Sequence, residues 1–206
     1  MKKFIILFFT ISIFSNSFCQ SVYDDQTTHI FKGNRYLPKI EVIQNKEQIK
    51  YTLFDKTNKI VKSENINFVN LPLERYLCFY NSIGFISDIN GYYFYDFITN
   101  KRLSFNYKDV QYDRYNEGIQ LGKFNPILKA NNLLVIIDEQ LSVYRTIQLR
   151  VKPNSKEYWI LMNEETDVIT GKIRLLKCVK LGRFTSENKY DEYIYDVSFN
   201  KLKLKN

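Results

Sequence analysis

Residues of the types that catalysis or metal binding needs are few and scattered in this 206-residue chain. Its single histidine, His29, lies near the start, so a histidine-based triad or metal site would have to be built at that end. Ser186 and Lys189 have the Ser-x-x-Lys spacing of penicillin-binding enzymes, but they stand in a polar turn without that class's partner motifs. The sequence contains no phosphate-binding glycine loop and no Cys-x-x-Cys pair. We therefore expect no metal and no cofactor, and a non-catalytic role is favoured.

Carboxylates offer one alternative, because a glycosidase needs only two of them. Asp109, Asp113 and Glu117 are spaced four apart in a polar stretch, and on a helix they would share a face and could bind a hard cation. Lys108 lies beside them and the spacing matches no calcium loop, which favours a solvated connection. A second acidic group, Glu164, Glu165 and Asp167, reads most simply as a polar hairpin turn.

Aromatic residues make up 16% of the chain, and tyrosines cluster within short apolar runs. Flat aromatic surface on a rigid sheet suits a sugar ring or a protein partner, because it buries much area at little entropy cost. The alternative is that these rings fill half-buried strand faces. The candidate binding residues are Tyr92, Tyr93, Tyr95, Trp159, Tyr193 and Tyr195.

The N-terminal segment has the form of a secretory signal. A positive start at Met1-Lys2-Lys3 precedes an apolar run from Phe4 to Phe14, and Ser17-Phe18-Cys19 fits a cleavage site. The sequence thus predicts a signal peptide over 1–19 and one mature domain over 20–206. The bulky Phe18 argues against a lipoprotein cleaved at Cys19. The apolar run is too short to span a bilayer, so we expect an exported protein, periplasmic or secreted, without a transmembrane anchor in the mature chain.

Two cysteines follow the predicted cleavage site, Cys78 and Cys178. In an oxidising compartment they are a candidate disulfide, which would close a loop of about 100 residues and stabilise the fold by about 4–5 kcal/mol. The alternative is two separate thiols on different strands. The net charge of +8 comes from lysines scattered through the chain rather than clustered, so we do not expect nucleic acid as a partner.

Extended structure dominates the rest of the sequence. Val143 to Val151 alternates, with Val143, Ile147 and Leu149 on one side, and this period of two predicts a half-buried strand. A short turn is expected near Pro126–Ala130 and a short helix over Leu71–Leu77.

A repeated turn pattern connects the expected strands. A residue that tolerates positive φ is followed by lysine and a returning strand, as a tight hairpin requires. Four turns share it: Thr57-Asn58-Lys59, Thr99-Asn100-Lys101, Thr170-Gly171-Lys172 and Phe199-Asn200-Lys201. The pattern predicts an all-β antiparallel meander of about ten strands in successive hairpins. It could form a barrel or a pair of bent sheets, or a small propeller-like array, because Asp55, Asp96 and Asp138 recur at nearly equal intervals.

These observations favour an exported, non-catalytic β-rich protein that binds a protein or glycan partner. Two alternatives remain open from the sequence. One is a lipocalin-like carrier of a small apolar ligand, which requires a barrel with an internal cavity. The other is a carboxylate-dependent hydrolase, which requires two suitably spaced acids in a cleft.

Overall fold

The computed structural model describes residues 20–21, 28–30, 33–43, 48–67, 76–88, 91–106, 108–110, 120–163, 165–179 and 189–205. The expected signal segment 1–19 and most of the expected helix over Leu71–Leu77 lie outside these residues. All regular structure in the described part of the chain is β-strand. None of its elements is a helix of the length and hydropathy needed to cross a membrane.

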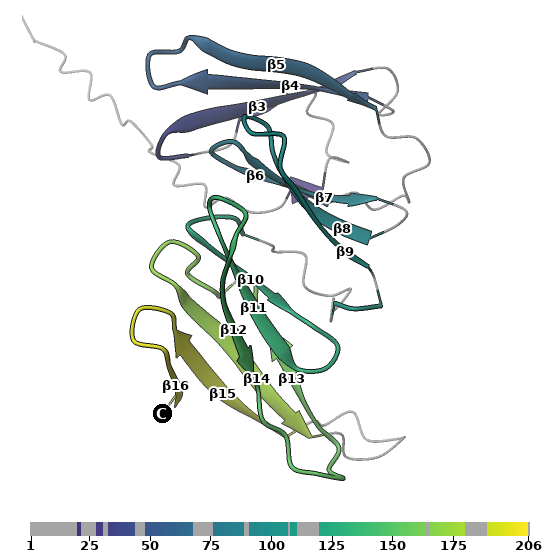
Figure 1. Cartoon of the computed structure of the whole chain (residues 1–206), viewed down its shortest axis with the longest axis vertical. Helices are drawn as coiled ribbons and strands as arrows, with labels where there is room; N and C mark the ends of the chain where they lie inside the picture. Colours follow the sequence, from purple (N-terminus) through teal and green to yellow (C-terminus); the bar gives the residue numbers. More distant parts are fainter. Residues whose placement is uncertain are drawn as a thin grey trace, which may run out of the picture.

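The strands form four antiparallel sheets that, apart from β1, follow one another along the chain (Figure 1). The first sheet contains β2 (Thr28–Ile30), β3 (Tyr36–Ile43), β4 (Gln48–Asp55) and β5 (Ile60–Asn67). The second contains β1 (Gln20–Ser21), β6 (Tyr76–Tyr80), β7 (Ile83–Asp88), β8 (Gly91–Asp96) and β9 (Arg102–Asn106). The third contains β10 (Phe124–Leu128), β11 (Leu133–Asp138) and β12 (Val143–Gln148). The fourth contains β13 (Glu157–Leu161), β14 (Lys172–Val179), β15 (Lys189–Asp196) and β16 (Lys201–Leu204).

The four sheets stack face to face in chain order, with the first at the top and the fourth at the bottom of Figure 1. Successive side chains of a strand point to opposite faces of its sheet. In β7, Phe85 therefore packs toward the third sheet and Ile86 toward the first. In β11, Leu134 packs toward the fourth sheet and Val135 toward the second. Leu134–Ile137 of β11 is a continuous apolar run because both of its faces are buried.

The expected all-β hairpin meander is confirmed, and the four sheets do not close into a barrel. The described strands form four separate small sheets, and apolar cores lie between the first and second, the second and third, and the third and fourth of them. The described residues contain sixteen strands rather than about ten, and two of these, β1 and β2, have only 2 and 3 residues.

The recurring aspartate ends the next-to-last strand of each sheet and holds the following turn. In the first sheet, Asp55 Oδ1 accepts hydrogen bonds from the backbone N–H groups of Thr57 (2.8 Å) and Lys59 (3.0 Å). Asn58 in this turn has φ 62°, as the sequence pattern requires. The same aspartate-to-backbone bonds occur at Asp96, Asp138, Asp167 and Asp196. The equal intervals end after Asp138 because the connections 149–156 and 162–171 between strands lengthen the chain before Asp196.

Two local expectations were wrong. The short turn expected near Pro126–Ala130 is mostly strand β10; proline is tolerated there because β10 is an edge strand, and an edge residue can lack an N–H without breaking a ladder. Val143 was expected on the buried side but is 56% exposed. A register shift between Ile136 and Ile137 places one extra residue in β12, which turns Val143 away from the face that Ile147 occupies.

Candidate functional site

Three of the six candidate aromatic residues lie inside the stack of sheets. Trp159 is buried in the fourth sheet, and its Nε1–H donates to the Arg150 carbonyl at 3.1 Å. Tyr195 is 1% exposed, and its hydroxyl donates to Asn200 Oδ1 at 2.7 Å. Tyr92 is buried in the second sheet. These rings fill the space between sheets.

The other three candidate aromatic residues are half-buried. The Arg102 guanidinium lies 3.9 Å from the centre of the Tyr93 ring. The Tyr95 hydroxyl donates to Asn100 Oδ1 at 2.9 Å, and Tyr193 packs edge-on to Trp159 at 5.0 Å between ring centres. Because β8 and β15 belong to different sheets, the six aromatic residues do not form one surface. Their role in partner binding stays a prediction.

The candidate disulfide is not formed. Cys78 and Cys178 are both buried thiols rather than halves of a bond. Cys78 lies in β6 and packs between the second and third sheets, whereas Cys178 lies in β14 of the fourth sheet. The third sheet separates the two strands in the stack (Figure 1), so the alternative of two separate thiols holds.

The acidic candidates are placed only in part. Asp109 is exposed, Glu165 forms an ion pair and Asp167 caps a turn, whereas Asp113, Glu117 and Glu164 lie outside the described residues. The same is true of Ser186, and only the backbone of His29 and Lys189 is described. Within the described part of the chain, no group of three or more His, Cys, Asp or Glu residues is arranged to hold a metal ion.

One pair of carboxylates shares an arginine. Glu165 and Glu192 lie 2.7 and 3.1 Å from the Arg174 guanidinium, and Lys205 Nζ lies 2.6 Å from Glu192. The hydrogen bonds from Lys205 and Arg174 lower the pKa of Glu192. This direction is opposite to the raised pKa that a glycosidase uses for its acid.

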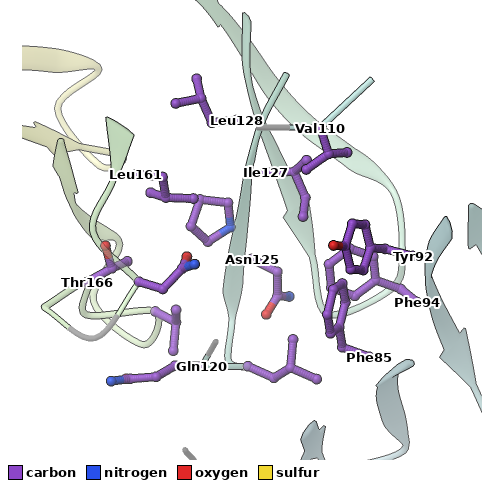
Figure 2. A pocket seen from close by; sticks show the side chains of 14 residues that line it. Phe85, Tyr92, Phe94, Val110, Gln120, Asn125, Ile127, Leu128, Leu161 and Thr166 are labelled. Atoms are coloured by element: carbon purple, nitrogen blue, oxygen red, sulfur yellow. The ribbon is translucent and has the colours of Figure 1, made fainter. Parts of the chain in front are cut away.

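A small cavity lies where the second, third and fourth sheets meet (Figure 2). Figure 2 shows Asn125 between an aromatic wall of Phe85, Tyr92 and Phe94 on one side and Thr166 with Leu161 on the other. Its volume is about 30 Å³, which is room for a water molecule. The Asn125 amide is already bonded to Gly122 N, Gly122 O and Ile137 O. The space is much smaller than the pocket of a small-molecule carrier.

A larger groove runs between the second and third sheets, with a volume of about 470 Å³ that falls in the range of ligand-binding clefts. We call it the β9–β12 groove. Its apolar residues are Leu103, Phe105, Leu133, Val135 and Val143, and its polar residues are Ser104, Asn106, Asp109, Lys129 and Thr146. Side chains of β9, β11 and β12, together with Asp109 and Lys129, thus line one cleft with both apolar and polar groups.

Defined contacts lie near both ends of the β9–β12 groove. At the turn end, Lys101 Nζ donates to the Gln140 carbonyl at 3.0 Å and to Ser142 Oγ at 3.1 Å. At the other end, the Ala130 N–H donates to the Asp109 carbonyl at 3.0 Å, and Asn106 Nδ2 donates to Asp109 Oδ2 at 3.3 Å. The bonds of Lys101 and of the Ala130 N–H thus connect the segments that flank the second and third sheets.

Lys129 is the cation of the β9–β12 groove. Its ammonium lies 6.0 Å from the centre of the Phe105 ring, at the outer limit of a cation–π contact. None of the carboxylates in the described ranges forms an ion pair with it. Sequence reasoning missed this groove because its walls come from separate hairpins and because the bulge in β12 reverses Val143.

Comparison with known proteins leaves the family open. No family model and no curated protein matches the chain. Among solved structures it is similar to the AfRom2 CNH domain, with 10% identity and a TM-score of 0.30 over 88% of this chain and 54% of that chain. The chain thus spans about half the length of that structure. At this level of likeness the functional argument rests on the geometry of the groove.

Proposed function

We propose that this chain is an exported, non-catalytic protein that binds a protein or glycan partner in the periplasm or at the cell surface through the β9–β12 groove. The observation that supports this most is the groove itself, a cleft of about 470 Å³ lined by both apolar and polar side chains. The form of residues 1–19 supports export.

The groove offers apolar surface that a partner can remove from water. Val143 is 56% exposed, and Leu103, Phe105 and Leu133 are half-buried in its walls. Burial of apolar area contributes about 25 cal/mol per Å², so a partner seated on these four side chains gains affinity without any rearrangement of the strands. Ser104, Asn106 and Thr146 supply hydrogen-bonding groups that can orient it.

Site-specific photo-crosslinking in the producing cells tests partner binding. A benzophenone side chain at Val143 lies in the groove, whereas the same group at Phe199, which is 80% exposed on the β15–β16 turn, serves as the matched control. We expect a discrete adduct from position 143 alone, and we expect it to vanish when Leu133→Arg places a charge in the groove. Equal labelling from both positions, or an adduct that survives Leu133→Arg, would contradict the proposal.

Export is tested on the same material. Intact-mass analysis of the protein from the periplasm or medium should give the mass of a chain beginning at Gln20. A mass that includes residues 1–19, or a lipid attached at Cys19, would refute the predicted processing.

A further inference from the structure

We infer that the occupant of the β9–β12 groove is an extended peptide segment of a partner protein, which adds to the second sheet as a strand alongside β9. This inference rests on the proposed binding function and specifies the chemistry of the partner. Strand addition combines backbone hydrogen bonds, which supply affinity, with side-chain pockets, which supply specificity.

The groove follows the edge of β9 rather than one of its faces. Among the described strands only β8 pairs with β9, which ends its sheet. Leu103, Ser104, Phe105 and Asn106 are consecutive, and all four line the groove. Because successive side chains of a strand alternate between faces, four consecutive lining residues mean that the groove exposes the backbone edge of β9 along its length.

The hydrogen-bond pattern shows which backbone groups face the groove. The Phe97 N–H donates to the Ser82 carbonyl, and the Asp96 N–H donates to the Lys101 carbonyl. Asp96 thus directs its backbone N–H toward β9, and because this direction alternates along a strand, Phe94 and Tyr92 do the same. Their partners in β9 are Leu103 and Phe105. Ser104, between these two, directs its N–H and carbonyl away from β8 and toward the groove.

The third sheet presents a face that an added strand would cover. Leu133 and Val135 point toward the second sheet, whose last strand is β9. Val143 on the same side of the third sheet remains 56% exposed. A strand beside β9 would extend the second sheet over this apolar surface and continue the packing seen throughout the stack. The length of β9, 5 residues, corresponds to about 17 Å of extended peptide.

The last strands of the other sheets carry register shifts or alternating lysines that hinder strand addition, whereas β9 pairs regularly with β8 and contains one charged residue, Arg102. β5 and β12 each contain a register shift next to their hairpin turn. β16 alternates lysines, with Lys201 and Lys203 in the strand and Lys205 directly after it. Bulges and lysines are the common devices that protect edge strands. The pairing of β9 with β8 is regular, so β9 is the last strand best suited to accept a partner.

Charge adds one side-chain requirement. Lys129 lies in the groove without a carboxylate among the described ion pairs, whereas Asp109 is already hydrogen-bonded to Asn106. An aspartate or glutamate in the bound segment would pair with the Lys129 ammonium. We therefore expect a segment that alternates apolar side chains and contains one acidic residue.

A phage-displayed library of short random peptides, panned on the mature protein, tests this inference. Selected peptides are then made synthetically and titrated by fluorescence anisotropy against wild type and two variants. Ser104→Pro removes the N–H that points into the groove, and we expect about a tenfold loss of affinity. Leu204→Pro is the matched control. In the β15–β16 pairing the Lys205 N–H bonds to the Glu192 carbonyl, so the backbone groups of Leu204 point away from β15, just as those of Ser104 point away from β8. This edge belongs to the fourth sheet, far from the groove. The affinity of this variant should equal that of wild type.

A second measurement uses the unaltered protein. Methylation of peptide backbone nitrogens at alternate positions should abolish binding in one register and leave it intact in the other, which side-chain docking alone would not produce. Lys129→Glu should shift selection from acidic to basic peptides. A peptide affinity that changes neither with Ser104→Pro nor with backbone methylation would overturn strand addition. Failure of the library to yield any binding peptide would overturn it as well. If the Val143 crosslink persists in either case, or if a glycan array binds instead, the proposed function stands and only this inference fails.

Discussion

Two buried tyrosine hydroxyls should respond in opposite directions when they are removed. Tyr51 in β4 is 0% exposed, and its ring stacks on Phe97 with 3.8 Å between ring centres. Its hydroxyl is the one buried side-chain polar atom in the described residues that lacks a hydrogen-bond partner. Burial, with smaller contributions from Asp96 and Glu64, raises the pKa of Tyr51 above its ordinary value, so the phenol stays neutral. An unsatisfied buried polar group costs about 1–3 kcal/mol.

Tyr51→Phe removes that cost while it keeps the ring, so we expect the free energy of unfolding to rise by about 1–3 kcal/mol. Tyr195→Phe deletes the same atom from an equally buried ring. That hydroxyl accepts from Arg145 Nη1 at 3.2 Å and donates to Asn200 Oδ1 at 2.7 Å. Two lost hydrogen bonds should lower the free energy of unfolding by about 1–2 kcal/mol.

Urea denaturation of the mature protein, followed by circular dichroism, measures both changes. Each kcal/mol should also move the thermal midpoint by about 2–4 °C for a chain of this size. A Tyr51→Phe variant that is less stable than wild type would refute the reasoning, since it would mean that the hydroxyl makes a bond that the packing here does not provide.

Three further predictions concern other parts of the stack. Asn125→Ala should lower the free energy of unfolding by about 3 kcal/mol in the same urea assay, because the buried Gly122 and Ile137 backbone groups lose their partner; a change below about 1 kcal/mol would contradict this. Hydrogen bonds from the Lys152 N–H and Lys177 lower the pKa of Glu157 in the folded protein. The carboxylate therefore stabilises the fold fully at pH values above its unfolded pKa of about 4.5, and this stabilisation is lost as the pH falls through the folded pKa. The urea midpoint of wild type should therefore decline on acidification more steeply than that of Glu157→Gln, and parallel curves would exclude this role. Both Cys78 and Cys178 should react slowly with maleimide in the folded protein and fully after denaturation without reductant, as measured by mass spectrometry. A denatured protein that does not react with maleimide and whose mass is lower by two hydrogens would instead contain a disulfide.

The hairpin turns were predictable from the sequence because their geometry depends on adjacent residues. Asn58, Asn100 and Asn200 all adopt the positive φ that their position before lysine indicated. The aspartates upstream bind the turn N–H groups within a few residues of themselves. The all-β class follows from the same local signals, which require no knowledge of how the sheets meet.

The packing of sheet on sheet, and with it the β9–β12 groove, was decided only in the tertiary structure. Counting alternate residues placed Val143 inside, but one extra residue in β12 reversed it. The aromatic residues that suggested a binding surface, such as Trp159 and Tyr195, were buried by a neighbouring sheet that no local pattern identifies. A strand has two faces and an edge, and its own sequence does not specify which of these another sheet will cover. That choice depends on burial of apolar surface between segments distant in the chain, which is why turns were predicted correctly and the site was not.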